Sequence, residues 1–247
     1  MAILDEHCAT VLLTAEQQGM LERYHALREA SKRLNTRLFR MLPRSAITRS
    51  AKDLGMLVHD TIVFRTIGES DILAGYAMHD YRPSSTAPSL VERFASPAFD
   101  KEAAGLDEAE AAVRRYKATA RFTIVQVRDV TPGFAIHVDD LLRGGSSLLL
   151  VDVWLSRTAV ASAVFAGRIH QAEGFWMTTG GGVPLDADTL ESVVHRLEGR
   201  YGERLARPDL LDPAQRSDLA RRVLRICLDR RMTEHMSYQD PQEQGDL

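Results

Sequence analysis

The sequence predicts an α+β protein, with helices at both ends and a small antiparallel β-barrel or sandwich between them. Five short runs rich in Val, Ile, Leu and Phe lie between residues 121 and 184, spaced roughly ten residues apart as in small antiparallel barrels. The flanking segments instead place apolar residues at helical spacing. We expect a mainly helical part at 1–118, a barrel-like core at 119–184, C-terminal helices at 185–232 and a disordered tail at 233–247.

The N-terminal part opens with the strongest helix signal in the chain. Thr14 and Gln17 have the spacing of a capping box, and Pro43 ends the helix that we predict over 15–42. A second helix is expected over 46–54, with Gly55 in the position that terminates helices. The first helix has one apolar stripe, formed by Met20, Tyr24, Leu27, Leu34, Leu38 and Met41.

Three shorter elements are expected before the core. The run TIVFRT at 61–66 is typical of a strand, and Ser70 could cap a helix that reaches 81. A fourth helix is predicted over 107–118, which is rich in alanine and contains no helix breaker.

Turn residues and alternation delimit the core. Pro132-Gly133 and Gly144-Gly145 predict tight turns. Phe134, Ile136 and Val138 alternate with other residues, as do Val151, Val153 and Leu155, so we predict strands there, with Gly180–Gly182 ending the sheet. Beyond it, Asp186 and the pair Asp212-Pro213 are helix start signals.

Composition excludes several classes of protein. The 247 residues carry a net charge of −3, which gives no global attraction to nucleic acid or membranes. Cys8 and Cys227 are too few for a disulfide framework, the N-terminus lacks a basic signal-peptide region, and no apolar run could span a bilayer. We therefore expect a cytoplasmic location and no membrane association.

The most distinctive charge feature is a basic stretch. Between residues 23 and 52 there are nine basic residues and one acid, Glu29. It could follow phosphates in a sequence-independent way, dock on an acidic partner, or pair with this chain's own acids Glu102, Asp107, Glu108 and Glu110. Dimerisation through the apolar stripe would use the same helix. The expected contact residues, here called the basic stripe, are Arg28, Lys32, Arg33, Arg37, Arg40, Arg44 and Arg49.

No motif for catalysis, metal or nucleotide binding is present. The segment TTGGG at 178–182 lacks the lysine and spacing of a P-loop, so a tight turn closing the sheet explains it better. A loose group of acids and histidines lacks metal-site spacing; it comprises His59, Asp60, Glu69, Asp71, His79 and Asp80. We expect no cofactor and no metal.

The core still contains polar positions where an active site could form. They are Asp140, Asp152, Ser156, Arg157 and Arg168. Charges buried there would need partners, and Asp–Arg pairs would provide them. The structural alternative is that Asp140 caps a turn and the others form ion pairs.

The core also resembles a family of uncharacterised bacterial proteins. The phrases VRDVTPGFAIHVDDLLRGGSSLLLVDVWLSRTA, GRIHQAEGFWMTTGGGVPL and DILAGYAMHDYR are similar to theirs, over about Leu21 to Leu185. Gly167 departs from the pattern, which has Ala or Thr there. The resemblance implies that the helical part and the barrel form one unit, but it brings no activity. The matching residues are Pro132, Gly133, Asp140, Leu141, Leu142, Gly144, Asp152, Ser156, Arg157 and Arg168.

These observations favour a non-catalytic interaction or adaptor protein with an unknown protein partner, because no convergent catalytic set is present. The alternatives are sequence-independent nucleic-acid binding through the basic stripe and an enzyme with its site in the core. A homodimer is compatible with each.

Overall fold

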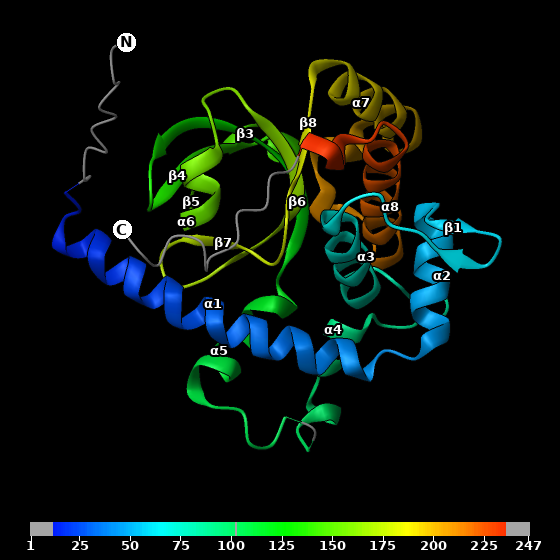
Figure 1. Ribbon diagram of the computed structural model, residues 1–247, viewed down its shortest axis with the longest axis horizontal. Helices are drawn as coiled ribbons and strands as arrows, with labels where there is room; N and C mark the ends of the chain where they lie inside the picture. The colour runs from blue at the N-terminus through cyan, green and yellow to red at the C-terminus, as the bar shows by residue number, and fades with distance from the viewer. Residues whose placement is uncertain (1–11, 102, 236–247) are drawn as a thin grey trace, which may run out of the picture.

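A computed structural model describes residues 12–101 and 103–235 and confirms the α+β class (Figure 1). The leading segment with Cys8, the acid Glu102 and the tail beyond 235 lie outside the described residues. The N-terminal elements are α1 (Ala15–Met41), α2 (Arg44–Leu54), the hairpin β1 (Leu57–Val58) and β2 (Thr61–Ile62), α3 (Ile67–His79), α4 (Leu90–Ala95) and α5 (Glu108–Ala118).

A five-stranded barrel follows. Its strands are β3 (Arg121–Thr131), β4 (Ala135–Asp140), β5 (Ser146–Val151), β6 (Val164–Gln171) and β7 (Trp176–Thr178). The order β3-β4-β5-β7-β6 closes because β3 also pairs with β6, and β8 (Val183–Leu185) adds to β6. The pairings are antiparallel except that of β5 with β7, which is parallel at Leu150 and Trp176.

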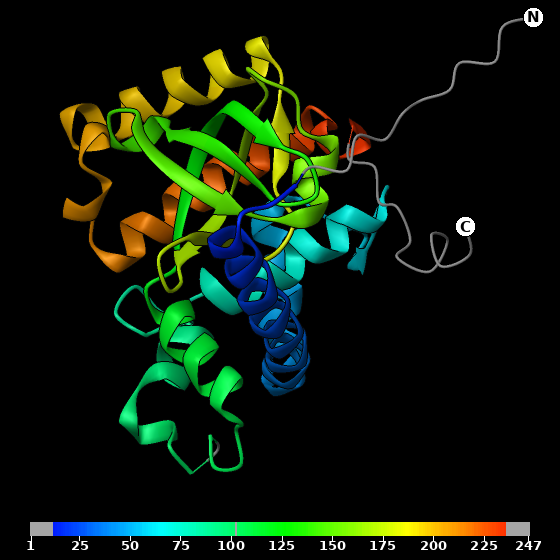
Figure 2. The same cartoon turned by 90° about the vertical axis from the view of Figure 1, so that its left-hand side faces the viewer.

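Helices surround the barrel. Helix α6 (Val153–Thr158) follows β5, and α7 (Ala187–Tyr201) and α8 (Pro213–Asp229) follow β8. In Figure 1, α1 crosses beneath the barrel, while α2, α3, α7 and α8 lie to its right. In Figure 2, α7 (yellow to orange) runs across the top of the barrel, and α4 and α5 (green) lie below it.

Three apolar clusters hold these layers together. One fills the barrel, with Ile136 and Leu150 fully buried. The second joins α1, α4 and α5 to the barrel, and the third joins α2, α3, α7 and α8 to it. The predicted stripe of α1 is therefore largely inside the chain's own core, since Tyr24, Leu34 and Leu38 are buried against it. The helical part and the barrel share a core, as the family resemblance implied.

Most helix signals carried by single residues were accurate, with Ser70 as the exception. Thr14 and Gln17 form the predicted capping box, and Gly55 ends α2 with a positive φ of 73°. Asp186 and Asp212 cap α7 and α8 as expected. The Ser70 cap was wrong: α3 begins one turn earlier after Thr66, and the Ser70 hydroxyl donates to the Ile67 carbonyl at 2.7 Å.

Two strand predictions were also wrong. The strand expected over 61–66 stops at Ile62. The alternation through Val153 and Leu155 is helical in α6, because the Asp152 carboxylate accepts a hydrogen bond from the Leu155 amide at 3.1 Å and begins the helix.

The ends of the sheet and of the chain need correction as well. Strand β8 follows Gly180–Gly182, so these glycines do not end the sheet. The predicted tail begins too early, because a final 3-10 turn spans Met232–His235. Within it, the buried Thr233 hydroxyl donates to Glu69 Oε1 at 3.2 Å.

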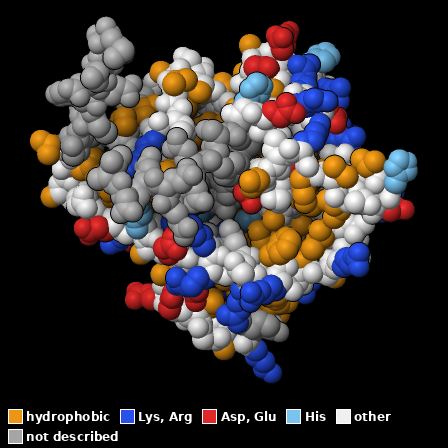
Figure 3. Space-filling view, viewed as in Figure 1, with side chains coloured by type: hydrophobic (Ala, Val, Ile, Leu, Met, Phe, Trp, Pro, Cys, Tyr) orange, Lys and Arg blue, Asp and Glu red, His pale blue; other side chains and the backbone are white. Residues whose placement is uncertain are grey.

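One face exposes apolar side chains. Figure 3 shows them gathered over α2, α3 and the β1–β2 hairpin. The exposed large apolar residues of the hairpin, of the segment after it and of the start of α3 are Val58, Val63, Phe64 and Ile67. No helix in the described part of the chain is both long and apolar enough to cross a bilayer.

Candidate functional site

The structure joins two sets of predicted residues at Thr178. Arg28, from the basic stripe, donates from Nη1 to the Thr178 carbonyl at 3.2 Å and to its hydroxyl at 3.5 Å. That hydroxyl donates in turn to Asp152 Oδ2 at 2.6 Å. Helix α1 therefore presents Arg28 to the end of β7, where the start of α6 holds Asp152.

Around this contact lies a group of basic side chains that we call the buried basic cluster. It comprises Arg28 from α1, His79 from α3, Lys117 from α5, and Arg168 and His170 from β6. Lys117 is 2% exposed, and its Nζ has no hydrogen-bond partner among the described residues. His170 is 1% exposed, and neither of its ring nitrogens has such a partner.

The charges of this cluster repel one another in a dry environment. Burial, with Arg28 and Arg168 nearby, lowers the pKa of Lys117 to about 7. Burial, with Lys117 and Arg28, lowers the pKa of His170 to about 3. Burial also places the pKa of His79 well below its ordinary value, and Arg168, Lys117 and His170 add to this effect. Both histidines are therefore neutral at pH 7.

Asp80 balances part of this charge, and Asp152 lies on the other side of the Thr178 hydroxyl from Arg28. Asp80 forms an ion pair with Arg168, which also donates to the Ala120 carbonyl at 3.3 Å. Burial raises the pKa of the Asp80 carboxyl, although Arg168 opposes the rise. Arg28 and Lys117 have no carboxylate within ion-pair distance in the described ranges, so the cluster keeps an excess of positive charge.

The cluster separates two cavities. The larger, here the large cavity, has a volume of about 980 Å³ and lies between α1, α3, α6 and the segment 178–182. Its wall is mainly apolar, with Tyr24, Ile72, Met78, Val153 and Phe165 among its residues. Its polar end contains Arg28, Asp152, Thr178 and Thr179.

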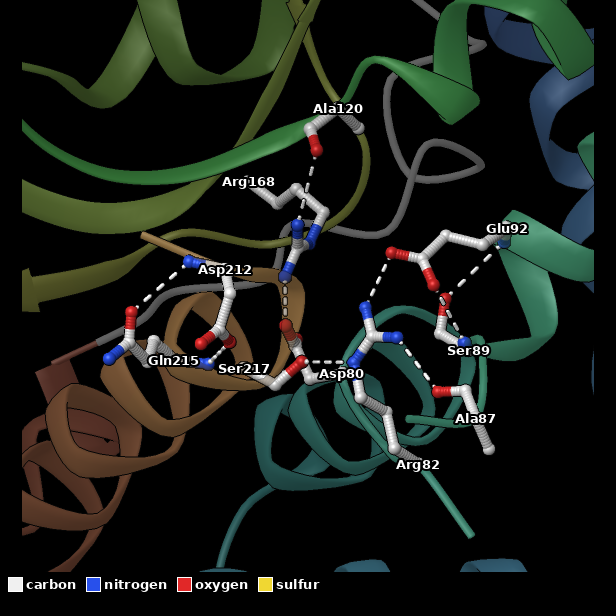
Figure 4. Close-up of polar contacts among 10 residues, drawn as sticks. All are labelled: Asp80, Arg82, Ala87, Ser89, Glu92, Ala120, Arg168, Asp212, Gln215 and Ser217. Carbon is white, nitrogen blue, oxygen red and sulfur yellow. Dashed lines mark hydrogen bonds and ion pairs between the residues drawn. The ribbon is translucent and has the colours of Figure 1, made fainter. Parts of the chain in front are cut away.

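The second cavity, here the arginine pocket, has a volume of about 290 Å³. Asp80 and Arg168 line both cavities, as do His79 and Phe122. Figure 4 shows its wall: Arg82 connects the Ala87 carbonyl, Glu92 on α4 and Ser217 on α8, while Arg168 reaches Asp80. Asp212 and Gln215 form the capping box of α8 beside it.

Glycine gives the 178–182 segment its close approach to β6. A Cβ on Gly182 would lie 2.9 Å from Cδ2 of the buried Phe165, so a larger residue would displace that ring. A Cβ on Gly167 would lie 3.4 Å from the Gly182 Cα, which is an ordinary contact. The Ala expected at 167 would therefore fit.

The other predicted core residues lie elsewhere. Asp140 is fully buried and accepts from Arg121 at 3.0 Å, from Arg143 at 3.3 Å and from the Leu142 amide, so it caps the turn after β4. Ser156 is buried, and its hydroxyl donates to the Val153 carbonyl. Arg157 is exposed, 5.1 Å from the Trp154 ring centre. Of the five, Asp152 and Arg168 line the large cavity.

Several members of the basic stripe have partners within the chain. Arg33 forms ion pairs with Asp107 at 2.6 Å and Glu110 at 2.9 Å, the pairing with this chain's own acids that the sequence left open. Lys32 pairs with Glu29. Arg49 on α2 lies 3.8 Å from Asp53. Arg37 and Arg40 lie on α1, and Arg44 lies on α2.

Lys117 and His170 were missed by sequence reasoning, although one signal existed. Lys117 lies four residues after the buried Val113, so it shares the apolar face of α5. His170 has no comparable signal, because a histidine in an amphipathic strand is ordinary. Within the described residues, no group of three or more His, Cys, Asp or Glu side chains could hold a metal ion.

Comparison with known proteins adds a family without an activity. Neither the curated proteins nor the solved structures contain a match to this chain. A family model does match residues 18–204, which cover α1 to the turn after α7 and include both cavities' shared wall. The chain therefore belongs to DUF7986, described as a family of unknown function.

Proposed function

We propose that this protein is a non-catalytic binding protein, and that its ligand is a small organic acid with an apolar body, held in the large cavity. The observation that carries the proposal is Arg28. Its guanidinium lies at the polar end of an apolar cavity and binds only the neutral oxygens of Thr178 among the described residues. An arginine in such a place favours a carboxylate.

The shape of the site supports this ligand class. Ligand cavities are typically apolar, with a few polar groups that fix orientation. Here the apolar wall of α1, α3 and α6 would contact the body of the ligand. Arg28 and the Thr179 side chain at the other end would hold the acid group. The unpaired positive charge of the buried basic cluster favours an anion over a neutral ligand.

A calorimetric titration with octanoate tests the proposal, with 1-octanol as the neutral probe of the same chain length. We expect octanoate to bind and Arg28→Gln to weaken binding about tenfold to a hundredfold, since a charge-assisted hydrogen bond contributes roughly 1.5–3 kcal/mol. Arg44→Gln, an exposed arginine on α2, is the matched control and should not change affinity. Equal binding by the Arg28 variant, or no octanoate binding at all, would refute the proposal.

The location and oligomeric state stay predictions. A cytoplasmic location is consistent with the free, buried thiol of Cys227. We expect a protein partner to dock on the surface outside the large cavity. Affinity capture with the octanoate-loaded protein would identify this partner.

A further inference from the structure

The arginine pocket is a second place with excess positive charge. Six basic residues line it, against the three acids Asp80, Glu92 and Asp209. With all groups ionised, the lining carries three net positive charges, one of which is offset by the buried carboxylate of Asp140 behind Arg121 and Arg143. The basic residues are Arg82, Lys117, Arg121, Arg143, Arg168 and Arg216.

Several donors in this lining lack acceptors. Lys117 Nζ, Arg121 Nε and Arg143 Nε are buried and have no hydrogen-bond partner in the described part of the chain. Arg216 is exposed on α8 and makes no ion pair there either. Lys117, Arg121 and Arg143 all line the arginine pocket. Buried donors without acceptors are costly, so an acceptor that enters the pocket would relieve this cost.

The arginines are held in place before any ligand arrives. Asp140 accepts from both Arg121 and Arg143, and the Arg121 guanidinium lies 4.2 Å from the Trp176 ring centre. Their side chains therefore lose little freedom on binding. Planar guanidinium groups fixed from several sides suit a tetrahedral oxyanion.

We propose that the arginine pocket binds a phosphate dianion, either inorganic phosphate or the phosphate group of a small monoester. With Asp140 counted, two negative charges would neutralise the remaining excess, whereas a monocarboxylate would leave one net positive charge. The volume of about 290 Å³ admits a phosphate and a short organic group. This site is separate from the end of the large cavity that contains Arg28, so it goes beyond the function proposed above.

Calorimetric titrations with inorganic phosphate and with glycerol 3-phosphate test the proposal at pH 7.5. We expect saturable binding with a Kd below about 1 mM, the range of a small charged ligand. Tighter binding of glycerol 3-phosphate would identify a monoester site, and tighter binding of phosphate would identify a free-phosphate site. If neither ligand saturates the protein by about 10 mM, the proposal is wrong.

Variants locate the binding. Arg216→Gln changes an exposed, unpaired side chain, so the fold should persist, and we expect at least a tenfold loss of affinity. Arg204→Gln, an exposed arginine outside the pocket, should stay within twofold. Lys117→Met should weaken binding and abolish the proton uptake that phosphate binding causes at pH 8. Unchanged affinity in the Arg216 variant would overturn the proposal, while Arg28→Gln should leave phosphate binding intact.

Discussion

Replacing Lys117 by methionine should stabilise this protein, although most changes of a buried residue destabilise. The methionine side chain is nearly as long as that of lysine. The substitution therefore keeps most of the packing and removes a buried amine that lacks a partner among the described residues. The fall in the pKa of Lys117 from 10.5 to about 7 corresponds to roughly 5 kcal/mol, at about 1.4 kcal/mol per factor of ten. This is an upper limit for the gain.

The gain should depend on pH in a defined direction. The folded pKa lies below the unfolded one, so the unfolded chain binds more protons between pH 7 and 10.5. The free energy of unfolding of wild type therefore rises with pH across this window. Below pH 7 the amine is charged in both states, and the full cost of burying that charge destabilises the folded protein. The difference between Lys117→Met and wild type should be largest near pH 6 and shrink toward pH 10.

Urea unfolding at several pH values, without phosphate or organic acids, measures this difference. Lys52→Met is the matched control, because Lys52 lies in the last turn of α2 as Lys117 does in α5, but it is exposed. The control should change the free energy of unfolding by less than about 0.5 kcal/mol. A Lys117 variant that is less stable than wild type, or a gain independent of pH, would refute the reasoning.

Three further outcomes are expected. The pKa of His170 is about 3 in the folded protein, so only the unfolded chain binds a proton at this residue as pH falls below about 6.5, and wild type should lose stability there. His170→Phe should reduce this loss, measured by acid unfolding. His137→Phe, at an exposed histidine, should not reduce it. Gly182→Ala should cost about 1–3 kcal/mol through its clash with Phe165, whereas Gly180→Ala, with open space around it, should cost less in thermal unfolding. Gel mobility shifts should show only weak binding of DNA or RNA by the basic stripe. This binding should be lost between low and physiological salt, because each phosphate contact releases counterions. Binding that does not change with salt concentration would contradict phosphate contacts by the stripe.

The predictable part of the fold rested on local signals. Capping boxes, the proline after α1 and the spacing of the α1 stripe each fix a helix by contacts within a few residues. The alternation in β4 was equally reliable because one face of that strand fills the barrel. The strand predicted through Val153 and Leu155 was wrong, because a short helix capped by Asp152 can show the same apolar alternation as a strand.

The site was harder to predict, since it forms only through long-range contacts. Arg28 appeared as one member of a charged stripe, and Asp152 as one polar residue of the core. They meet at Thr178, which lies 150 residues after Arg28 and 26 residues after Asp152. Lys117 resembles a snorkelling lysine in sequence, because nothing local shows that its amine remains buried.

A crystal structure of the protein soaked with 8-bromooctanoate tests the central claim most directly. The account predicts a carboxylate within hydrogen-bond distance of the Arg28 guanidinium, and an anomalous bromine peak against the apolar wall of α1, α3 and α6. A large cavity that contains only water under these conditions, or a carboxylate bound away from Arg28, would contradict it.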